Sequence, residues 1–185
     1  MEYIEELNDY GVSTTRLLSR DDVHRQGLWH RGFVGVIINE NDEVLMQQRS
    51  NNKEKFPGLW DLSGAGHVMA GEDSFASLIR ELSEEIGAYV ERTVTAKKCR
   101  YIESFKNTHS YFDKKLNQEV HEKCWYDFFL IRHNQEISEF KFNDNEVQDV
   151  KWMSIYDIKK LEKENRMHPR TEWIDIIQRY LNNIQ

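Results

Sequence analysis

Residues 66–88 read GHVMAGEDSFASLIRELSEEIGA, and the rest of the chain is interpreted outward from this stretch. A turn that contains glycines leads into a segment whose apolar side chains recur at i, i+3, i+4, i+7 and i+11. This spacing predicts a helix with one buried stripe. The stripe consists of Phe75, Leu78, Ile79, Leu82 and Ile86. Gly87 follows it, at a position where glycine commonly ends a helix.

Three carboxylates gather beside this stripe. Glu81, Glu84 and Glu85 stand at i, i+3 and i+4, so a helix places them on one surface, where like charges repel. A solvated acidic face accounts for such a cluster when it stands alone. A hard divalent cation accounts for it too, because Mg²⁺ or Mn²⁺ takes oxygen ligands and inverts the local electrostatics.

The cluster belongs to a longer pattern, G-x5-E-x7-R-E-U-x-E-E-x-G-U, in which U is apolar. Its seven fixed residues coincide by chance with a probability on the order of 10⁻⁸ per starting position. The pattern resembles the signature of the Nudix hydrolases, although Ala88 fills a slot that usually holds a larger aliphatic residue. The resemblance implies an enzyme that cleaves diphosphate bonds with Mg²⁺ or Mn²⁺ as cofactor.

The resemblance also implies roles for individual residues. The metal ligands would be Glu81, Glu84 and Glu85, with a backbone carbonyl near Gly66, while Glu72 and Arg80 would form a pair that ties the loop to the helix. Catalytic roles are assigned to Arg80 and to Glu84, the first choice of general base. Glu122 and Glu146 stand in reserve as bases.

A wider similarity, over roughly residues 20–160, is to isopentenyl-diphosphate isomerase, which is itself a Nudix-fold enzyme. The segments that show this similarity are QQRS at 47–50, KFPGLW at 55–60, GH at 66–67 and NEV at 145–147. The isomerases hold a metal with histidines and glutamates. The resemblance therefore implies a second site, for a transition metal, at positions that match His30, His67 and, with a one-residue shift, His24. Either Glu119 or Glu122 would complete it, with Glu122 preferred. Ordinary packing is the alternative for these histidines.

One residue speaks against isomerase chemistry. The catalytic cysteine of the isomerases falls at Ala65, and a methyl group cannot donate or accept a proton. The preferred function is therefore a Mg²⁺-dependent pyrophosphohydrolase acting on a small diphosphate compound, such as one linked to a nucleoside. An isomerase-like enzyme and a non-catalytic diphosphate-binding module are the alternatives. Arg49 and Lys55 are candidate substrate contacts, although each can equally be a solvated charge.

Length and composition set the remaining expectations. With 185 residues, the chain is long enough for one domain with its own core. We expect a Nudix domain at 28–165, preceded by a hairpin and lead-in at 1–27 and followed by a helix at 166–185 that packs on the same domain. The two cysteines, Cys99 and Cys124, are typical of buried thiols in a reducing compartment. The formal charge of −7 disfavours nucleic acid and membrane as partners. We expect a cytoplasmic protein. The sequence does not determine its oligomeric state, and a homodimer is among the alternatives.

Patterns along the chain predict a mixed sheet with helices on both faces, an α/β/α sandwich. Alternation and β-branched residues predict a hairpin within 2–18 and strands near 28–40, 44–49, 89–105, 119–133 and 149–153. A capping box at Ser154 opens one further helix, and Pro169 is expected to open the last.

Overall fold

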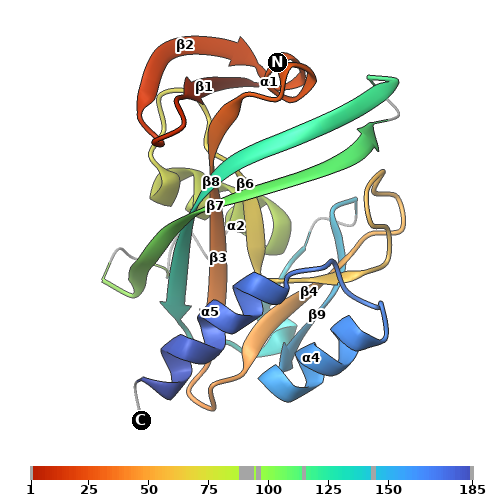
Figure 1. Ribbon diagram of the computed structural model, residues 1–185. Coiled ribbons are helices and arrows are strands. Elements are labelled where there is room, and N and C mark those ends of the chain that lie inside the picture. Colours follow the sequence, from red (N-terminus) through yellow and green to blue (C-terminus); the bar gives the residue numbers. More distant parts are fainter. Residues whose placement is uncertain (1, 88–93, 95–96, 114–115, 143–144, 184–185) are drawn as a thin grey trace. The chain divides into compact units, whose positions relative to one another are not determined.

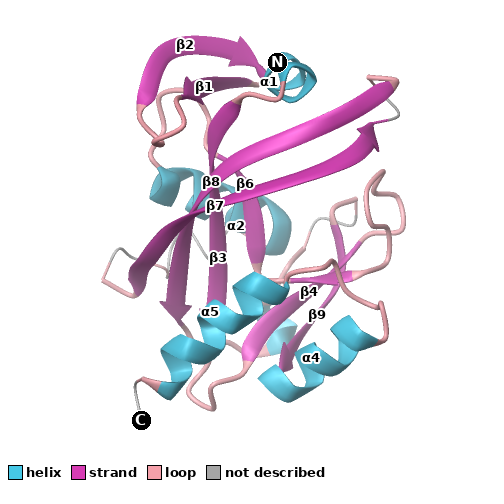
Figure 2. Ribbon diagram, in the orientation of Figure 1, coloured by secondary structure: helices cyan, strands magenta, loops and turns pink. Residues whose placement is uncertain are grey.

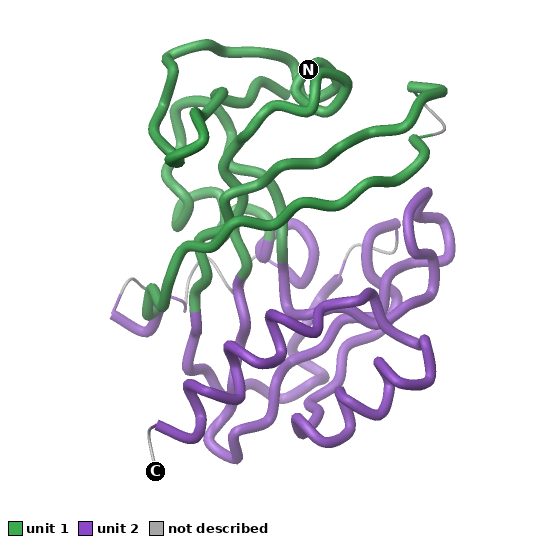
Figure 3. The backbone as a smooth tube through the Cα atoms, in the orientation of Figure 1, with its two compact units in different colours: residues 1–34, 65–81, 100–129 green, residues 35–64, 82–99, 130–185 purple. Residues whose placement is uncertain are grey.

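The structure is a computed structural model that describes residues 2–87, 94, 97–113, 116–142 and 145–183 (Figure 1). Its contacts divide the chain into two compact units (Figure 3). Unit 1 contains residues 1–34, 65–81 and 100–129, and unit 2 contains residues 35–64, 82–99 and 130–185. Strands β3 (Trp29–Ile38) and β8 (Gln118–Arg132) and helix α2 (Ser74–Ile86) each contribute residues to both units.

Unit 1 begins with the predicted hairpin. Strands β1 (Tyr3–Leu7) and β2 (Ser13–Ser19) pair antiparallel, with Tyr3 opposite Ser19. Helix α1 (Arg20–Gln26) follows directly. The Ser19 side chain caps it by accepting the Asp22 N–H, and Gly27 ends it in the left-handed conformation, with φ of 60°. These two caps fix a helix of only seven residues.

Helix α2 has the bounds and the buried stripe that its spacing predicts. Leu78 and Leu82 are fully buried and Ile86 is 1% exposed, while Phe75 and Ile79 are half-buried at the edges of the stripe. Gly87 follows with φ of 112°, a conformation that L-residues with a Cβ avoid. Ala88, the last residue of the box, lies outside the described residues.

The remaining strands of unit 1 are β6 (Gly64–His67), most of β7 (Cys99–Asp113) and most of β8. The predicted strand at 89–105 is correct from Cys99 onward and continues to Asp113; residues 89–93 and 95–96 lie outside the described part. Strand β7 pairs with β8, β8 pairs with β3, and β6 also pairs with β3.

Unit 2 is built on β4 (Val44–Arg49), which pairs antiparallel with β9 (Val147–Met153) on one side and with the short β5 (Trp60–Asp61) on the other. Ser154 caps α4 (Ile155–Lys163) by accepting the Asp157 N–H, as its capping box predicts. A single 3-10 turn, η1 (Ile137–Glu139), lies between β8 and β9.

The last helix, α5 (Thr171–Asn182), begins later than predicted. Pro169 does not open it, because the preceding segment is held extended against β5. The Trp60 N–H bonds to Arg166 O at 3.0 Å, the His168 N–H bonds to Trp60 O at 2.8 Å, and Met167 forms a parallel bridge with Trp60. Tertiary hydrogen bonds therefore override the local signal for a helix start.

Together these elements form the predicted α/β fold, a mixed sheet with helices (Figure 2). None of the helices in the described part of the chain combines the length and the apolar character that crossing a bilayer requires.

Candidate functional site

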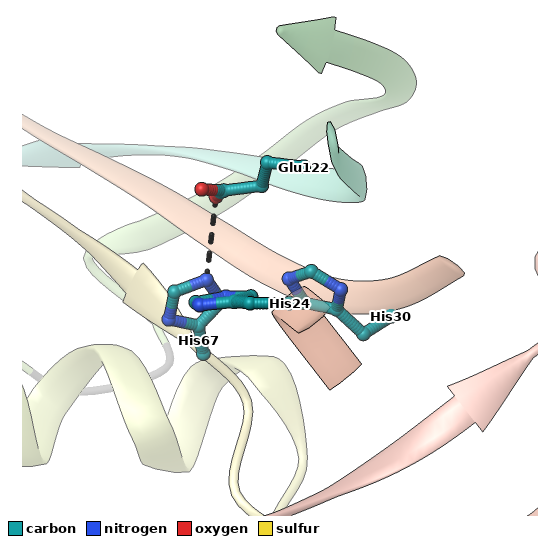
Figure 4. Close-up of side chains that lie close together, drawn as sticks. All are labelled: His24, His30, His67 and Glu122. Carbon is teal, nitrogen blue, oxygen red and sulfur yellow. Dashed lines mark ion pairs between the residues drawn. The ribbon is translucent and has the colours of Figure 1, made fainter. Parts of the chain in front are cut away.

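Four side chains of unit 1 converge on one point (Figure 4). They are His24 from α1, His30 from β3, His67 from β6 and Glu122 from β8, and each offers a ligand atom that lies within 4.8 Å of the others. The three imidazole rings stand 4.9–5.5 Å apart, centroid to centroid. The cluster therefore joins residues from four different elements.

Local structure explains how each side chain reaches this point. The caps of α1 orient His24 inward, where it is buried beside Val23. His30 is the second residue of β3 and lies opposite Glu6 of β1. Along β8, buried and more exposed residues alternate, which buries Glu122 and exposes Glu119. Of the two glutamates that the sequence leaves open, the structure brings Glu122 into the cluster.

His30 has the protonation pattern of a ligand. Its Nδ1 lies 3.0 Å from the carbonyl oxygen of Leu28, which can only accept, so the ring proton resides on Nδ1. Nε2 is buried and has no hydrogen-bond partner among the described residues. Burial, and next the neighbouring His67, lower the pKa of His30 to about 3, so the imidazole is neutral near pH 7.

Glu122 supplies the negative charge of the cluster. Burial acts to raise its pKa, but the neighbouring histidines, first His67 and then His24 and His109, together outweigh burial and hold the pKa well below its usual range. The His67 Nε2 to Glu122 Oε1 distance is 3.4 Å, longer than a charge-assisted hydrogen bond. His109 Nε2 lies 3.6 Å from the other carboxylate oxygen, and its ring stacks on Tyr111. Sequence reasoning missed His109, whose place opposite Glu122 depends on the pairing of β7 with β8.

This donor set fits a transition metal. Three imidazoles and one carboxylate are ligands of Zn²⁺, Mn²⁺ or Fe²⁺ more than of Mg²⁺. The hydrogen bond from His30 Nδ1 to a carbonyl is the usual way in which a ligating imidazole is oriented. Packing alone does not explain a buried Nε2 without a hydrogen bond.

The carboxylates of α2 are oriented by neighbouring side chains. Arg80 Nη1 donates to Glu81 Oε1 at 2.9 Å, and Arg80 Nε donates to Glu72 Oε1 at 3.3 Å. The predicted contact between Glu72 and Arg80 is thus present, and it extends to Glu81. Burial acts to lower the pKa of Arg80, but the two carboxylates outweigh burial and raise it.

Glu85 is oriented from β4, because Gln47 Nε2 donates to Glu85 Oε2 at 3.0 Å. Glu84 is exposed. Sequence reasoning missed this role of Gln47, because nothing in residues 47–50 shows which side chain faces α2.

Two glycines allow the backbone to approach α2 closely. A Cβ at Gly64 would come within 2.7 Å of Leu82 Cδ2 and 4.0 Å of Glu85 Oε2. At Gly66 it would come within 2.9 Å of Phe33 and 3.6 Å of Glu81 Cγ. The glycines thus leave room for the side chains of α2, Glu81 and Glu85 among them, to lie close to the backbone of β6.

The predicted substrate contacts lie at the end of β4, which carries Arg49, and in the loop that follows it, which carries Lys55. Arg49 Nε and Nη2 both donate to the Lys55 carbonyl oxygen, at 3.1 and 3.0 Å, so part of the guanidinium holds the loop itself. Lys53 and Glu146 form an ion pair. Glu146, one of the reserve bases, is therefore already engaged.

A second buried constellation, in unit 2, was not anticipated. The Asp61 carboxylate is 4% exposed; it accepts two hydrogen bonds from Arg170, at 3.0 and 3.1 Å, and lies 3.0 Å from His168 Nδ1. The His168 ring stacks on Phe56 with centroids 3.9 Å apart. More than a hundred residues separate Asp61 from its partners, so no local pattern could reveal them.

Comparison with known proteins identifies the family. Residues 28–174 match the family model of the NUDIX domain. The chain is 30% identical over 153 residues to Nudix hydrolase 3 of Arabidopsis thaliana; the match covers 82% of this chain but 19% of that longer protein. It is 27% identical over 173 residues to isopentenyl-diphosphate Delta-isomerase 1 of Photorhabdus laumondii, with 90% of each chain covered.

The fold has known counterparts as well. A crystal structure of a Deinococcus radiodurans protein superimposes with a TM-score of 0.68 at 19% identity, over 96% of this chain and 98% of that one. The family match spans most of the chain, and it includes α2 with its glutamates and two of the three clustered histidines, His30 and His67. The chain therefore belongs to the Nudix family, in a branch whose relatives include proteins named isopentenyl-diphosphate isomerases.

Proposed function

We propose that the protein is a divalent-cation-dependent pyrophosphohydrolase that cleaves a small diphosphate-containing substrate. The observation that carries the proposal is the complete carboxylate set of α2. Glu81 is oriented by Arg80 and Glu85 by Gln47, with glycine backbone packed against the helix. Such support is expected where ligands must be held in place.

In this proposal Glu81, Glu84 and Glu85, with a backbone carbonyl near Gly66, hold Mg²⁺ or Mn²⁺. When bound, the cation would neutralise charge at the diphosphate and would make water a better nucleophile. The protein's own residues keep the ligands in place. Arg80, which also bonds to Glu72 in the loop before α2, orients Glu81, and Gln47 of β4 orients Glu85.

The relatives named isomerases make proton transfer on a prenyl diphosphate the second candidate. Ala65 argues against it, because it stands where those enzymes carry their catalytic cysteine and it has no proton to exchange. We further propose that the cluster of His24, His30, His67 and Glu122 holds a transition metal, a property that hydrolysis by α2 does not require.

A substrate screen tests the proposed function. The panel contains nucleoside diphosphates, dinucleotides, nucleotide sugars, coenzyme A and isopentenyl diphosphate, each with Mg²⁺ or Mn²⁺, and scores released phosphate after phosphatase treatment. We expect cation-dependent cleavage of at least one compound. Isomerisation of isopentenyl diphosphate, or no turnover of any compound, would contradict the proposal.

A further inference from the structure

His168 carries an imidazole nitrogen that the fold orients but does not use. Its Nδ1 lies 3.0 Å from Asp61 Oδ2, and because an ionised carboxylate can only accept, Nδ1 carries the proton. Among the described residues no hydrogen bond engages Nε2, and the side chain is 17% exposed. The lone pair of Nε2 is therefore not engaged by the described residues.

The residues around His168 hold its ring in one orientation. Phe56 stacks on it at 3.9 Å, with 26° between the planes, and does so from a backbone φ of 52°, which bulky residues avoid. Backbone bonds between Trp60 and the 166–168 segment fix the main chain. Strained backbone persists where surrounding structure over-determines it, often at functional sites.

The charges of Asp61 and Arg170 balance each other, so the site around His168 is not an anion-binding site. Asp61 is buried and accepts both arms of the Arg170 guanidinium, which lies over the Trp173 ring at 3.7 Å. The cation of Arg170 is thereby neutralised. What remains for chemistry is a hydrogen-bond acceptor, Nε2 of His168, rather than a net positive charge.

The register of unit 2 places Asp61, the partner of His168, on the same face of the sheet as Gln47, which contacts Glu85. Asp61 of β5 lies directly opposite Gln47 of β4, and such antiparallel partners project to the same face with Cβ atoms about 5 Å apart. Gln47 reaches Glu85 on α2 at 3.0 Å. His168 is thus separated from the box carboxylate by one cross-strand pair.

We propose that His168 Nε2 is the proton acceptor for the water that attacks the diphosphate, with Asp61 as its positioning residue. The proposal rests on the proposed function. A bond forms between the water oxygen and phosphorus, and the bond from that phosphorus to the bridging oxygen breaks. The electron pair leaves with the departing phosphate, and one water proton passes to Nε2 and then to solvent.

The carboxylates first considered for this role have other engagements. Glu84 is assigned to the cation, Glu122 lies in the histidine cluster, and Glu146 is ion-paired with Lys53. A carboxylate-oriented imidazole, in contrast, is a common general base, because the carboxylate fixes its tautomer and stabilises the imidazolium that forms.

The surrounding charges set the pH at which this acceptor is available. Three groups face His168: Asp61 from β5, Arg170 from its own segment and Arg49 from β4. Burial lowers the pKa of His168, and the hydrogen bond with Asp61 opposes that shift without reversing it. The imidazole is therefore neutral near pH 7, and activity should fall as pH drops through its pKa.

The test uses His168→Asn, because the asparagine amide can keep the N–H bond to Asp61 while Nε2 is lost. On a substrate found in the screen, we expect kcat to fall by about 10²-fold or more, while the midpoint temperature of thermal unfolding stays unchanged. The loss of activity at low pH that the wild type shows should be absent from the pH–rate profile of the variant. His133→Asn is the matched control, since His133 is a buried histidine of unit 2 that also has a lowered pKa. It should retain wild-type kinetics.

Chemical rescue keeps the test decisive if His168→Asn folds poorly. His168→Gly should regain activity with added imidazole, which a merely structural role would not produce. A His168→Asn enzyme within threefold of wild-type kcat, or a folded His168→Gly enzyme that imidazole does not rescue, would overturn the inference while leaving the proposed function intact. A wild type that cleaves no diphosphate would instead contradict the proposed function.

Discussion

Arg80 joins two carboxylates, and its removal should affect both stability and turnover. The guanidinium and its partners are about one-third exposed, so the network should stabilise the fold only modestly, by about 1 kcal/mol. The larger effect of Arg80→Ala should be on kcat, because Glu81 loses its orientation. Denaturant unfolding and steady-state kinetics measure the two effects separately. Arg132→Ala, which removes an ion pair with Asp42, is the control and should leave kcat unchanged. An Arg80→Ala enzyme with wild-type stability and kinetics would show that the network contributes nothing.

Asp61 predicts an acid-sensitive fold. Burial acts to raise its pKa, but Arg170 and His168 outweigh burial and hold the pKa well below its ordinary value of 3.8. Such a group stabilises the protein above its unfolded pKa, and this stabilisation is lost as pH falls through the folded value. The wild-type free energy of unfolding should therefore fall steeply below about pH 4.

Asp61→Asn should remove that part of the pH dependence and cost about 3–5 kcal/mol at neutral pH, because Arg170 is left without its buried partner. Urea unfolding from pH 7 to pH 3 measures both quantities. An equally steep acid slope in the variant would mean that other carboxylates cause the loss.

At the residue scale, sequence reasoning reached those side chains that local patterns or family motifs mark. The box glutamates follow from helical spacing, and His24, His30 and His67 follow from the isomerase resemblance. The choice between Glu119 and Glu122 required knowing which side chains of β8 are buried. Asp61, His168 and Arg170 stayed hidden because a contact across more than a hundred residues leaves no local signature.

At the scale of elements, hydrophobic periodicity predicted α2, since the buried face of this helix is a local property of the sequence. Weak alternation and β-branched residues near Gly11 predicted the pairing of β1 with β2. The proline signal for a helix start failed at α5. There the backbone of residues 166–168 bonds to Trp60 and stays extended, so the helix begins at Thr171 rather than at Pro169. Long-range pairing is the competing effect that a proline signal cannot include.

The end of α2 allows a matched test of backbone strain. Gly87 and Gly71 both have positive φ, 112° and 86°, so alanine at either position should cost about 1–2 kcal/mol. A Cβ at Gly87 would also meet Lys141 O at 2.8 Å, whereas a Cβ at Gly71 meets nothing within 4 Å. Gly87→Ala should therefore lower the free energy of unfolding more than Gly71→Ala does. Equal losses in urea unfolding would show that the Lys141 contact is relieved at no cost.

At the scale of the whole molecule, the chain divides into two units that both draw on β3, β8 and α2. The division predicted from sequence, into 1–27, 28–165 and 166–185, follows chain order instead and remains a prediction. Chain order could not anticipate the units, because each gathers three separate segments by long-range contacts.

The histidine cluster predicts metal content. Protein purified without chelator should carry a tightly held transition metal, because three imidazoles and Glu122 lie within 4.8 Å of one another. His30→Ala combined with His67→Ala should remove this metal, while Mg²⁺-dependent hydrolysis by the α2 carboxylates persists. Elemental analysis of both proteins is the measurement. A wild type without such a metal, even after incubation with Zn²⁺ or Mn²⁺, would leave these histidines as packing or substrate-contact residues.

Glu85→Gln tests most directly whether a cation held by α2 drives hydrolysis. Glutamine keeps the size of the side chain, and its amide oxygen can still accept the hydrogen bond from Gln47, but the negative charge that a cation requires is lost. The measurement is the rate of phosphate release with Mg²⁺ on the best substrate, for wild type, Glu85→Gln and Glu139→Gln, a control at an exposed carboxylate. The account predicts a loss of at least about 10²-fold for Glu85→Gln alone, with the fold intact. A folded Glu85→Gln enzyme with near-wild-type turnover would contradict it.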